Sequence, residues 1–385
     1  MTLAGDGTGV RRTRAALVAL LTLAGLATAT PPAGAATVSC SATVFRSKPS
    51  SHVWYRIPSV VRTPSGTLVA FAERRRSTGA ASDVSDTEIV RARSTDGGCH
   101  WGKPAVVADQ GRGTVGNPAP VVDTTTGEVL LLSVFRAPGS PTSKGLHLQR
   151  STDDGVTFTP YTDAGVDTSK VPGFHGGLTG PGHALQLHSA TSPHRGRIVV
   201  PMGYFKDGRY GSYGLVSDDH GAHWRVGYDQ SVAEGHIEGT VAELPDGRLW
   251  VSYRVRGTSV AVGRSRVDGF SLDGGTTLDA GLARTPLKIV AIQGSALGLP
   301  GTRAGTLAYS TPSAHGSRTE RRGMTVFTSS GAGLAERWKA HAVGSAKRPA
   351  AYSDLVALGD QRVGVLFETG KRSWKERIDF RTVDL

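Results

Sequence analysis

The sequence predicts an all-β fold, a six-bladed β-propeller, on the basis of three observations. A Ser-x-Asp-x-Gly turn, followed three residues later by an aromatic, begins at Ser94, Ser151 and Ser217; a weaker copy begins at Ser271, and residues 329–338 keep its outline. The four copies lie 54 to 66 residues apart, which suits a four-stranded propeller blade as the repeated unit. Strand-like apolar runs follow Gly-containing turns throughout. Fifty-one glycines and twenty prolines also favour short strands over long helices.

The first element, residues 1–35, is predicted to be a secretory signal sequence. Three arginines within 11–14 precede an apolar stretch at 15–27, and small residues at 33–35 form a cleavage site. The apolar stretch is too short to be a convincing membrane span. We therefore expect general secretion of a soluble extracellular protein, with no membrane insertion.

Residues 36–385 are predicted to form a single propeller domain, because no linker or low-complexity segment divides them. Six blades would use this length, and residues 378–383 are the expected closing strand. Other predicted strands, several of them following a Pro/Thr-x-Gly turn, lie at 67–72, 119–122, 128–133, 197–201 and 248–253.

Cys40 and Cys99 are the two cysteines of the sequence, and both lie in the part expected to be exported. Oxidation is the default outside the cell, so we predict a disulfide between them. It would tie the N-terminal strand to the first repeated turn and contribute roughly 4 kcal/mol on the entropic model. The alternative is two free buried thiols.

A net charge of +12 favours an anionic partner: nucleic acid, an acidic surface or an acidic sugar. No basic run is interleaved with aromatics, which makes nucleic acid the weakest of the three. The histidines form no metal-binding set. His220 and His223 lie in a repeated turn and are expected to face solvent. His175, His183 and His188 are either ordinary surface residues, which is the favoured interpretation, or part of a loop that lines the substrate site.

A Tyr-Arg-Ile-Pro motif at 55–58 opens the domain just before the first repeated turn. Together with the turns, and with the stretches 116–120 and 179–187, it resembles the sialidase superfamily over essentially the whole mature chain. The resemblance implies a secreted exo-α-sialidase that releases terminal sialic acid with retention and without a metal or organic cofactor. It also implies sialylated glycoproteins, gangliosides and oligosaccharides as partners, and we expect a monomer.

The substrate of such an enzyme carries a carboxylate on its anomeric carbon, and guanidinium groups bind a carboxylate through paired hydrogen bonds. The family uses three arginines for this purpose. By resemblance the first is Arg56 and the second is Arg254. The third is one of Arg318, Arg321 and Arg322, of which Arg321 fits the family's spacing best.

The same carboxylate would repel an acidic nucleophile, and sialidases use a tyrosine instead. By resemblance the nucleophile is Tyr352, and Glu238 is the base that takes its proton. Glu243 is the second candidate for the base, although its place in the strand pattern suggests that it faces outward.

The departing oxygen needs a proton, and the resemblance assigns the acid to Asp83, with Asp86 as the alternative. It further suggests that Glu73 orients an arginine and that Arg75 lies near the carboxylate. Three other functions remain open: an enzyme for the deaminated sugar, a sialyl-transferring or anhydro-forming relative, and a propeller that binds acidic sugars without turnover.

Overall fold

The computed structural model describes residues 39–385. Within that range it leaves out 79–81, 141–142, 168–176, 207–208, 232–234, 256–264, 286, 288, 300–305, 314–319, 331–337 and 360. The predicted signal sequence, His175, Arg318 and most of the fifth repeat outline therefore lie outside the described residues. No helix among the described residues is long and apolar enough to cross a membrane.

The described residues form strands and one short 3₁₀ helix, η1 (Pro49–Ser51), so the predicted all-β fold is confirmed. The strands are β1 (Ser41–Arg46), β2 (Val53–Arg62), β3 (Leu68–Arg76), β4 (Asp86–Ser94), β5 (Ala105–Ala108), β6 (Thr114–Val122), β7 (Val129–Arg136), β8 (Ser143–Ser151), β9 (Thr162–Asp163), β10 (Val166–Asp167), β11 (Leu178–Thr179), β12 (Leu185–Gln186), β13 (Ile198–Lys206), β14 (Arg209–Ser217), β15 (Trp224–Ser231), β16 (His236–Glu243), β17 (Leu249–Val255), β18 (Arg266–Ser271), β19 (Ala283–Arg284), β20 (Ser295–Gly298), β21 (Thr306–Pro312), β22 (Met324–Ser330), β23 (Lys339–Ala342), β24 (Ala350–Gly359), β25 (Arg362–Thr369) and β26 (Arg377–Asp384).

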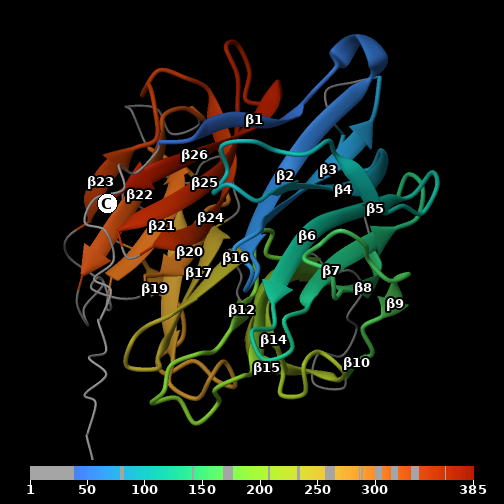
Figure 1. Ribbon diagram of the computed structural model, residues 1–385. Coiled ribbons are helices and arrows are strands. Elements are labelled where there is room, and N and C mark those ends of the chain that lie inside the picture. Colours follow the sequence, from blue (N-terminus) through green and yellow to red (C-terminus); the bar gives the residue numbers. More distant parts are fainter. Residues whose placement is uncertain are drawn as a thin grey trace, which may run out of the picture. The chain divides into compact units, whose positions relative to one another are not determined.

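Hydrogen bonds join the described strands into sheets that are arranged like the blades of a propeller (Figure 1). Strands β16–β19 form one four-stranded sheet, β20–β23 form another, and β13–β15 form the centre of a third. The first eight strands after β1 form a larger sheet in which β4 and β6 share a single parallel pair, Thr87 with Thr114. The innermost strands contact one another in sequence, β2 against β6 and β24, and β20 against β16 and β24.

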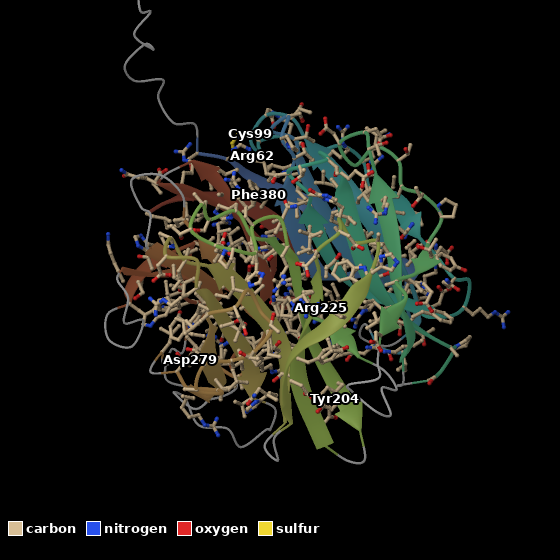
Figure 2. All side chains as sticks on the ribbon, turned by 90° about the horizontal axis from the view of Figure 1, so that it is seen from below. Arg62, Cys99, Tyr204, Arg225, Asp279 and Phe380 are labelled. Carbon is tan, nitrogen blue, oxygen red and sulfur yellow. A yellow bond between two sulfur atoms is a disulfide. The ribbon has the colours of Figure 1, made fainter. Side chains whose placement is uncertain are left out.

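The last sheet is built from both ends of the described chain, in the order β1-β26-β25-β24. Cys40, next to β1, is bonded to Cys99, which confirms the predicted disulfide; their Cα atoms lie 4.7 Å apart. Gly98, next to Cys99, packs directly on β26, because its φ is +95° and a Cβ there would overlap the ring of Phe380. Cys99 and Phe380 are labelled in Figure 2, and the ring of Trp101 packs edge-on against that of Phe380, with 5.2 Å between the ring centres.

Four repeated turns share one hydrogen-bond pattern. In the turn at Ser217, the hydroxyl donates to Asp219 (2.9 Å) and accepts the amide of Gly221 (2.9 Å), while Asp219 accepts the amide of His223. The turns at Ser94, Ser151 and Ser271 repeat these contacts. The serine and aspartate therefore close each hairpin locally, as their side-chain chemistry predicts.

Arginines on strands outside the repeated turns hold two of these turns. Arg93 donates to the carbonyl of Asp154 (2.7 Å), and Arg150 donates to the carbonyl of His220 (3.0 Å). His220 and His223 were both expected to face solvent, and both are exposed, with side-chain exposures of 46% and 90%. The ring of His220 also contacts the buried carboxylate of Asp123 (2.6 Å).

The core lies between neighbouring sheets rather than in one central mass. Leu130 and Leu132 of β7, for example, are fully buried in one cluster with Ile198 and Val200 of β13. Each such side chain contributes about 1.5–3 kcal/mol relative to an exposed one. This packing leaves the ends of the innermost strands free to carry polar groups.

Candidate active site

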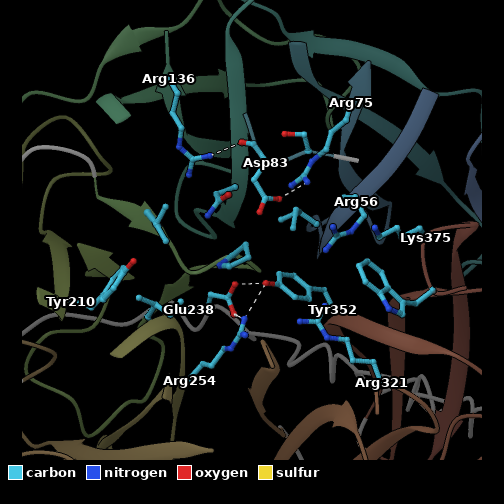
Figure 3. A pocket seen from close by; sticks show the side chains of 17 residues that line it. Arg56, Arg75, Asp83, Arg136, Tyr210, Glu238, Arg254, Arg321, Tyr352 and Lys375 are labelled. Atoms are coloured by element: carbon cyan, nitrogen blue, oxygen red, sulfur yellow. Dashed lines mark hydrogen bonds and ion pairs between the residues drawn. The ribbon is translucent and has the colours of Figure 1, made fainter. Parts of the chain in front are cut away.

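A pocket of about 590 Å³ collects side chains from strands that are far apart in the sequence (Figure 3). All six predicted site residues line it: Arg56, Asp83, Glu238, Arg254, Arg321 and Tyr352. The structure therefore brings the predicted residues together, while their catalytic roles stay predictions. No residue of the four repeated turns is among the residues that line the pocket.

Four innermost strands carry a β-bulge where they reach the pocket. The register shifts in β2 after Arg56, in β6 after Gly116, in β16 after Ile237 and in β24 after Ala350. At three of these bulges a non-glycine residue has a positive φ: Ile57 (57°), Asn117 (54°) and Glu238 (51°). Such conformations cost about 1–3 kcal/mol each and cluster at functional sites.

Tyr352 and Glu238 are in direct contact at the centre of the pocket. The tyrosine hydroxyl donates a hydrogen bond to one carboxylate oxygen of Glu238, and Arg254 Nη1 donates to the other (2.6 Å). Arg254 Nη1 also lies 3.3 Å from the tyrosine oxygen. A base, a hydroxyl and a cation thus share one hydrogen-bonded group.

Burial, and then the negative charge of Glu238, raise the pKa of Tyr352. Burial opposes the charge of Arg254, but the carboxylate of Glu238 outweighs it and raises the pKa of the guanidinium. The free site therefore holds a neutral tyrosine beside a permanent cation. Any reaction at the Tyr352 oxygen would need an acceptor for its proton, and the carboxylate oxygen of Glu238 is the atom to which the hydroxyl donates.

Arg56 is buried and is paired with a carboxylate that the sequence analysis did not identify. Its Nε lies 2.6 Å from Glu368 Oε1, and the amide of Ile57 donates to the same oxygen (3.0 Å). The guanidinium lies 4.4 Å from the centre of the Trp374 ring. A buried guanidinium needs such a counter-charge, and an acid at the end of the apolar run 363–367 was the available signal.

Arg321 is the member of its predicted group that lines the pocket, and its guanidinium lies 5.1 Å from the centre of the Trp374 ring. Arg322 is paired with Glu320 and does not line the pocket. Arg318 lies outside the described residues. Trp374 therefore lies against the first and third predicted clamp arginines at once.

Asp83 lies on the loop before β4 with its side chain 78% exposed. Arg75 Nη1 is 2.5 Å from its carboxylate, and Arg136 donates to its backbone carbonyl (3.1 Å). The surrounding pocket removes part of the water around Asp83, which opposes ionisation, but Arg75 outweighs this desolvation and lowers the pKa of Asp83. Asp86, the alternative acid, does not line the pocket; it is the first residue of β4 and lies 3.9 Å from Arg76.

Glu73 does contact an arginine, as the resemblance suggested. Its carboxylate binds Arg75 Nε (2.7 Å) and accepts the amide of Asn117 at the β6 bulge (2.7 Å). Arg75 in turn lines the pocket next to Asp83. The pair therefore links β3 and the predicted acid Asp83 to the bulge of β6.

The expectation that Glu243 faces outward was wrong. It is 4% exposed and accepts the backbone amides of His188 (2.7 Å) and Ser189 (3.1 Å), because both faces of β16 pack against other segments. It does not line the pocket, and neither do His183 and His188. Among the described residues, no group of His, Cys, Asp and Glu side chains could hold a metal ion.

The sequence analysis also missed Arg136, Trp374 and Lys375, which carry no motif that distinguishes them from surface residues. Among the described residues that line the pocket, six are cationic and two, Asp83 and Glu238, are acidic. The Nε atoms of Arg136 and Arg254 are buried without a hydrogen-bond partner in the described part of the chain. The pocket is therefore suited to an anion that brings several acceptors.

Residues 66–365 match the family model of the BNR repeat-like domain. The chain is 30% identical to the sialidase of Micromonospora viridifaciens, with 82% of this chain and 50% of that protein covered, and 30% identical to an exo-alpha-sialidase of Aspergillus fumigatus, with 83% and 82% covered. The chain belongs to the BNR-repeat sialidase family. The family is one of glycoside hydrolases, and the chain spans half the length of the Micromonospora relative.

The solved structures agree on the fold. The Hadza microbial sialidase Hz136 superposes with a TM-score of 0.74 at 23% identity, covering 90% of this chain and 68% of that chain. An intramolecular trans-sialidase from Ruminococcus gnavus superposes with a TM-score of 0.70 at 18% identity, covering 89% and 97%. The fold of this chain is thus a sialidase-like propeller.

Proposed function

We propose that this protein is a secreted exo-α-sialidase that releases terminal sialic acid from glycoproteins, gangliosides and oligosaccharides with retention. The observation that carries the proposal is the contact of Tyr352 with Glu238 in a pocket that Arg56, Arg254, Arg321 and Asp83 also line. A site that only bound acidic sugars would have no need of a tyrosine bonded to a base.

Arg56, Arg254 and Arg321 would bind the carboxylate of the sugar. Their charges are permanent, and each reaches the pocket from a different strand or loop. The unpartnered Nε of Arg254 supports this role, because a carboxylate can accept a hydrogen bond from this atom and another from a second donor. Bound in this way, the anomeric carbon would lie next to the carboxylate and within reach of Tyr352.

In the first step, the Tyr352 oxygen would form a bond to the anomeric carbon while its proton passes to Glu238. The bond from that carbon to the leaving oxygen breaks, and Asp83 protonates the leaving oxygen. In the second step, Asp83 takes a proton from water, the water oxygen attacks the anomeric carbon, and Tyr352 departs with the proton from Glu238. Two displacements at one carbon give retention.

Asp83 must be protonated for the first step, whereas Arg75 lowers its pKa in the free protein. The exposed carboxylate offers a way to meet this requirement. A bound sugar and aglycone would cover Asp83 and remove its water, and this desolvation raises the pKa of a carboxyl group. We therefore propose that substrate binding raises the pKa of Asp83, so that its carboxyl group is protonated when the first step begins.

The proposal extends to the organisation of the chain. Residues 1–35 would be removed as a secretory signal, and residues 36–385 would form one monomeric domain. We propose six blades, because the large sheet divides into β2–β5 and β6–β9, which a single parallel residue pair connects. Each group then has the four strands of one blade.

The test is an assay of the purified secreted protein on aryl α-glycosides of N-acetylneuraminic acid and of the deaminated sugar. We expect release of N-acetylneuraminic acid, with the α anomer as the first product by NMR. Release of the deaminated sugar alone would mean that this sugar, and not N-acetylneuraminic acid, is the substrate. An anhydro or transferred product would mean that the reaction is not hydrolysis. Release of neither sugar would refute the hydrolase.

The nucleophile is tested by Tyr352→Phe in the same assay. We expect kcat to fall by roughly 100-fold or more, because both the nucleophile and its proton transfer are removed. Tyr161→Phe is the matched control, since Tyr161 is 45% exposed and does not line the pocket. Full activity of Tyr352→Phe would refute the assignment and leave the enzyme class intact.

A further inference from the structure

A buried polar cluster lies directly behind Tyr352. It consists of His183, Gln293, Ser295, Ser353 and Asp354, and we refer to it as the Asp354 cluster. None of these residues lines the pocket, but Asp354 follows Tyr352 by two positions and His183 follows the pocket residue Pro181 by two. The cluster therefore lies under the pocket and adjoins its wall in two places.

Asp354 is fully buried and binds donors from three other segments of the chain. Its carboxylate accepts the amide of Val60 in β2 (2.8 Å), the hydroxyl of Ser295 in β20 (2.7 Å) and the ring Nδ1 of His183 (2.8 Å). The amide of His183 donates to it as well (3.1 Å). One carboxylate thus connects strands β2, β20 and β24 to the segment between β11 and β12.

The cluster also binds the backbone of β24 next to the bulge. Ala351 and Tyr352 form that bulge, the register with β25 resumes at Ser353, and β24 is an edge strand, so the cluster supplies partners that a further strand would otherwise give. The amide of Ser353 donates to Gln293 Oε1 (3.0 Å), while Gln293 Nε2 donates to the carbonyls of Ser353 (3.0 Å) and Pro181 (2.9 Å). The peptide after Tyr352 is therefore held by a side chain.

His183 and Asp354 are hydrogen-bonded to each other in this position. Burial opposes protonation of His183, but the carboxylate of Asp354 outweighs it and raises the pKa of the histidine. Among the described residues, Asp354 is the charged group that acts on the ring. Gly182 leaves room for the pair, since its φ is +117° and a Cβ there would lie 3.1 Å from Asp354 Oδ1.

We propose that the Asp354 cluster positions Tyr352, holding its hydroxyl in line with the anomeric carbon of the bound sugar; this inference rests on the proposed function. The side chain of Tyr352 projects from a bulge, where the regular ladder does not fix its direction. The cluster holds Ser353 and Asp354, the two residues that follow Tyr352, through hydrogen bonds to other segments of the chain. Its residues touch no substrate, so they act through the tyrosine.

The test compares steady-state kinetics of Asp354→Asn and His183→Leu with those of the wild type. We expect kcat to fall by about 10- to 100-fold, because a small displacement of a reacting group has that effect. KM should stay within about threefold, because the clamp arginines remain. His183→Asn should retain most of the activity, since its side-chain amide can donate where Nδ1 does.

Asp123→Asn is the matched control, because Asp123 is also fully buried and also binds a histidine Nδ1, that of His220, far from the pocket lining. It should lower the melting temperature without lowering kcat. If Asp354→Asn does not fold, Gln293→Leu is the second variant. It removes the acceptor of the Ser353 amide and leaves the hydrogen bond between His183 and Asp354 in place. The same fall in kcat is expected.

An unchanged kcat in Asp354→Asn and His183→Leu, or in Gln293→Leu, would overturn the inference. So would an equal loss in Asp123→Asn, because the effect would then follow from lost stability alone. If the wild type releases neither sugar, the proposed function fails and this role fails with it. An active wild type with unaffected variants contradicts the cluster alone.

Discussion

At the scale of single residues, the carboxylates beside the pocket each bind a cation and a backbone amide. Glu368 holds Arg56 and the amide of Ile57, and it also accepts the amide of Tyr352 (3.3 Å). Glu73 does the same for Arg75 and the amide of a bulge residue. The group that neutralises a buried arginine therefore also determines the path of the strand beside it.

Asp268 is a carboxyl group whose burial has a measurable cost. Burial raises its pKa from 3.8 to about 6, although it accepts a hydrogen bond from Ser252 (2.6 Å). The folded state thus favours the protonated form. The associated stability is complete below about pH 4, where the unfolded chain is protonated too, and is lost as the pH rises through 6.

Asp268→Asn should therefore stabilise the protein at pH 7.5 relative to the wild type, by roughly 2–3 kcal/mol more than at pH 4. Urea unfolding at the two pH values measures the difference. Asp109→Asn removes an exposed carboxylate as the control. A difference between Asp268→Asn and the wild type that does not change with pH would contradict the prediction.

At this scale the motifs identified residues that line the pocket but not the carboxylates that support them. Arg56 and Tyr352 could be predicted because they lie in short recognisable stretches. Glu368 could not, because its partner is 312 positions away in the sequence and no local pattern links the two. Glu243 was misread because alternation along a strand says nothing when both faces of that strand are covered.

At the scale of elements, the repeated turns and the bulges have different structural roles. The Ser-x-Asp-x-Gly turns close hairpins at one end of the strands, and the bulges redirect side chains at the pocket. The turns follow from local chemistry, in which a hydroxyl and a carboxylate cap nearby amides. The bulges follow from tertiary contacts, since Ile57 and Glu238 adopt a positive φ that neither residue type favours.

Ser217→Ala should lower the free energy of unfolding by roughly 1–3 kcal/mol, because the amide of Gly221 and the carboxylate of Asp219 each lose a partner. The activity of the folded protein should not change, because the turn does not line the pocket. Chemical denaturation and a sialidase assay at 25 °C measure the two properties.

Ser345→Ala is the control for this substitution, since Ser345 is an exposed turn serine outside the repeated motif. Equal stability of Ser217→Ala and Ser345→Ala would mean that the repeated hydrogen bonds contribute nothing net. A fall in kcat for Ser217→Ala would mean that the turn acts on the pocket.

The sequence therefore allowed the turns to be predicted and concealed the bulges. The repeat is visible because each copy uses the same residue types at the same spacing. A bulge needs only one extra residue in one strand, and Asn117 and Glu238 lie in runs that otherwise resemble regular strands. Only the pairing of neighbouring strands reveals them.

At the scale of the whole molecule, the disulfide joins the turn after β4 to the start of β1, which belongs to the last sheet. We predict that Cys40→Ser with Cys99→Ser lowers the free energy of unfolding by about 4 kcal/mol, since the bond spans 59 positions. Urea unfolding of the variant measures the loss.

The wild type treated with a reductant should unfold at the same urea concentration as that double variant. A variant as stable as the oxidised wild type would mean that β1 remains in place without the bond. A much larger loss would mean that the bond also stabilises contacts of the first turn with Phe380.

The propeller could be predicted from period and composition, and the closing strand at 378–383 falls within β26. The partner of that strand could not be inferred, because β1 is too short and too irregular to stand out. The pairing depends on where the ends of a ring meet, which is a property of the assembled sheets.

The pairing of the two chain ends determines when the pocket is completed during folding. Tyr352 and Glu368 lie on β24 and β25 of the one sheet that needs β1, and Thr43 of β1 bonds Asp379 of β26 across 336 positions. Loop closure over such a distance comes late in folding. A chain still being synthesised can therefore form its earlier sheets before the sheet that carries Tyr352 is complete, and the pocket is complete only when β1 has paired with β26.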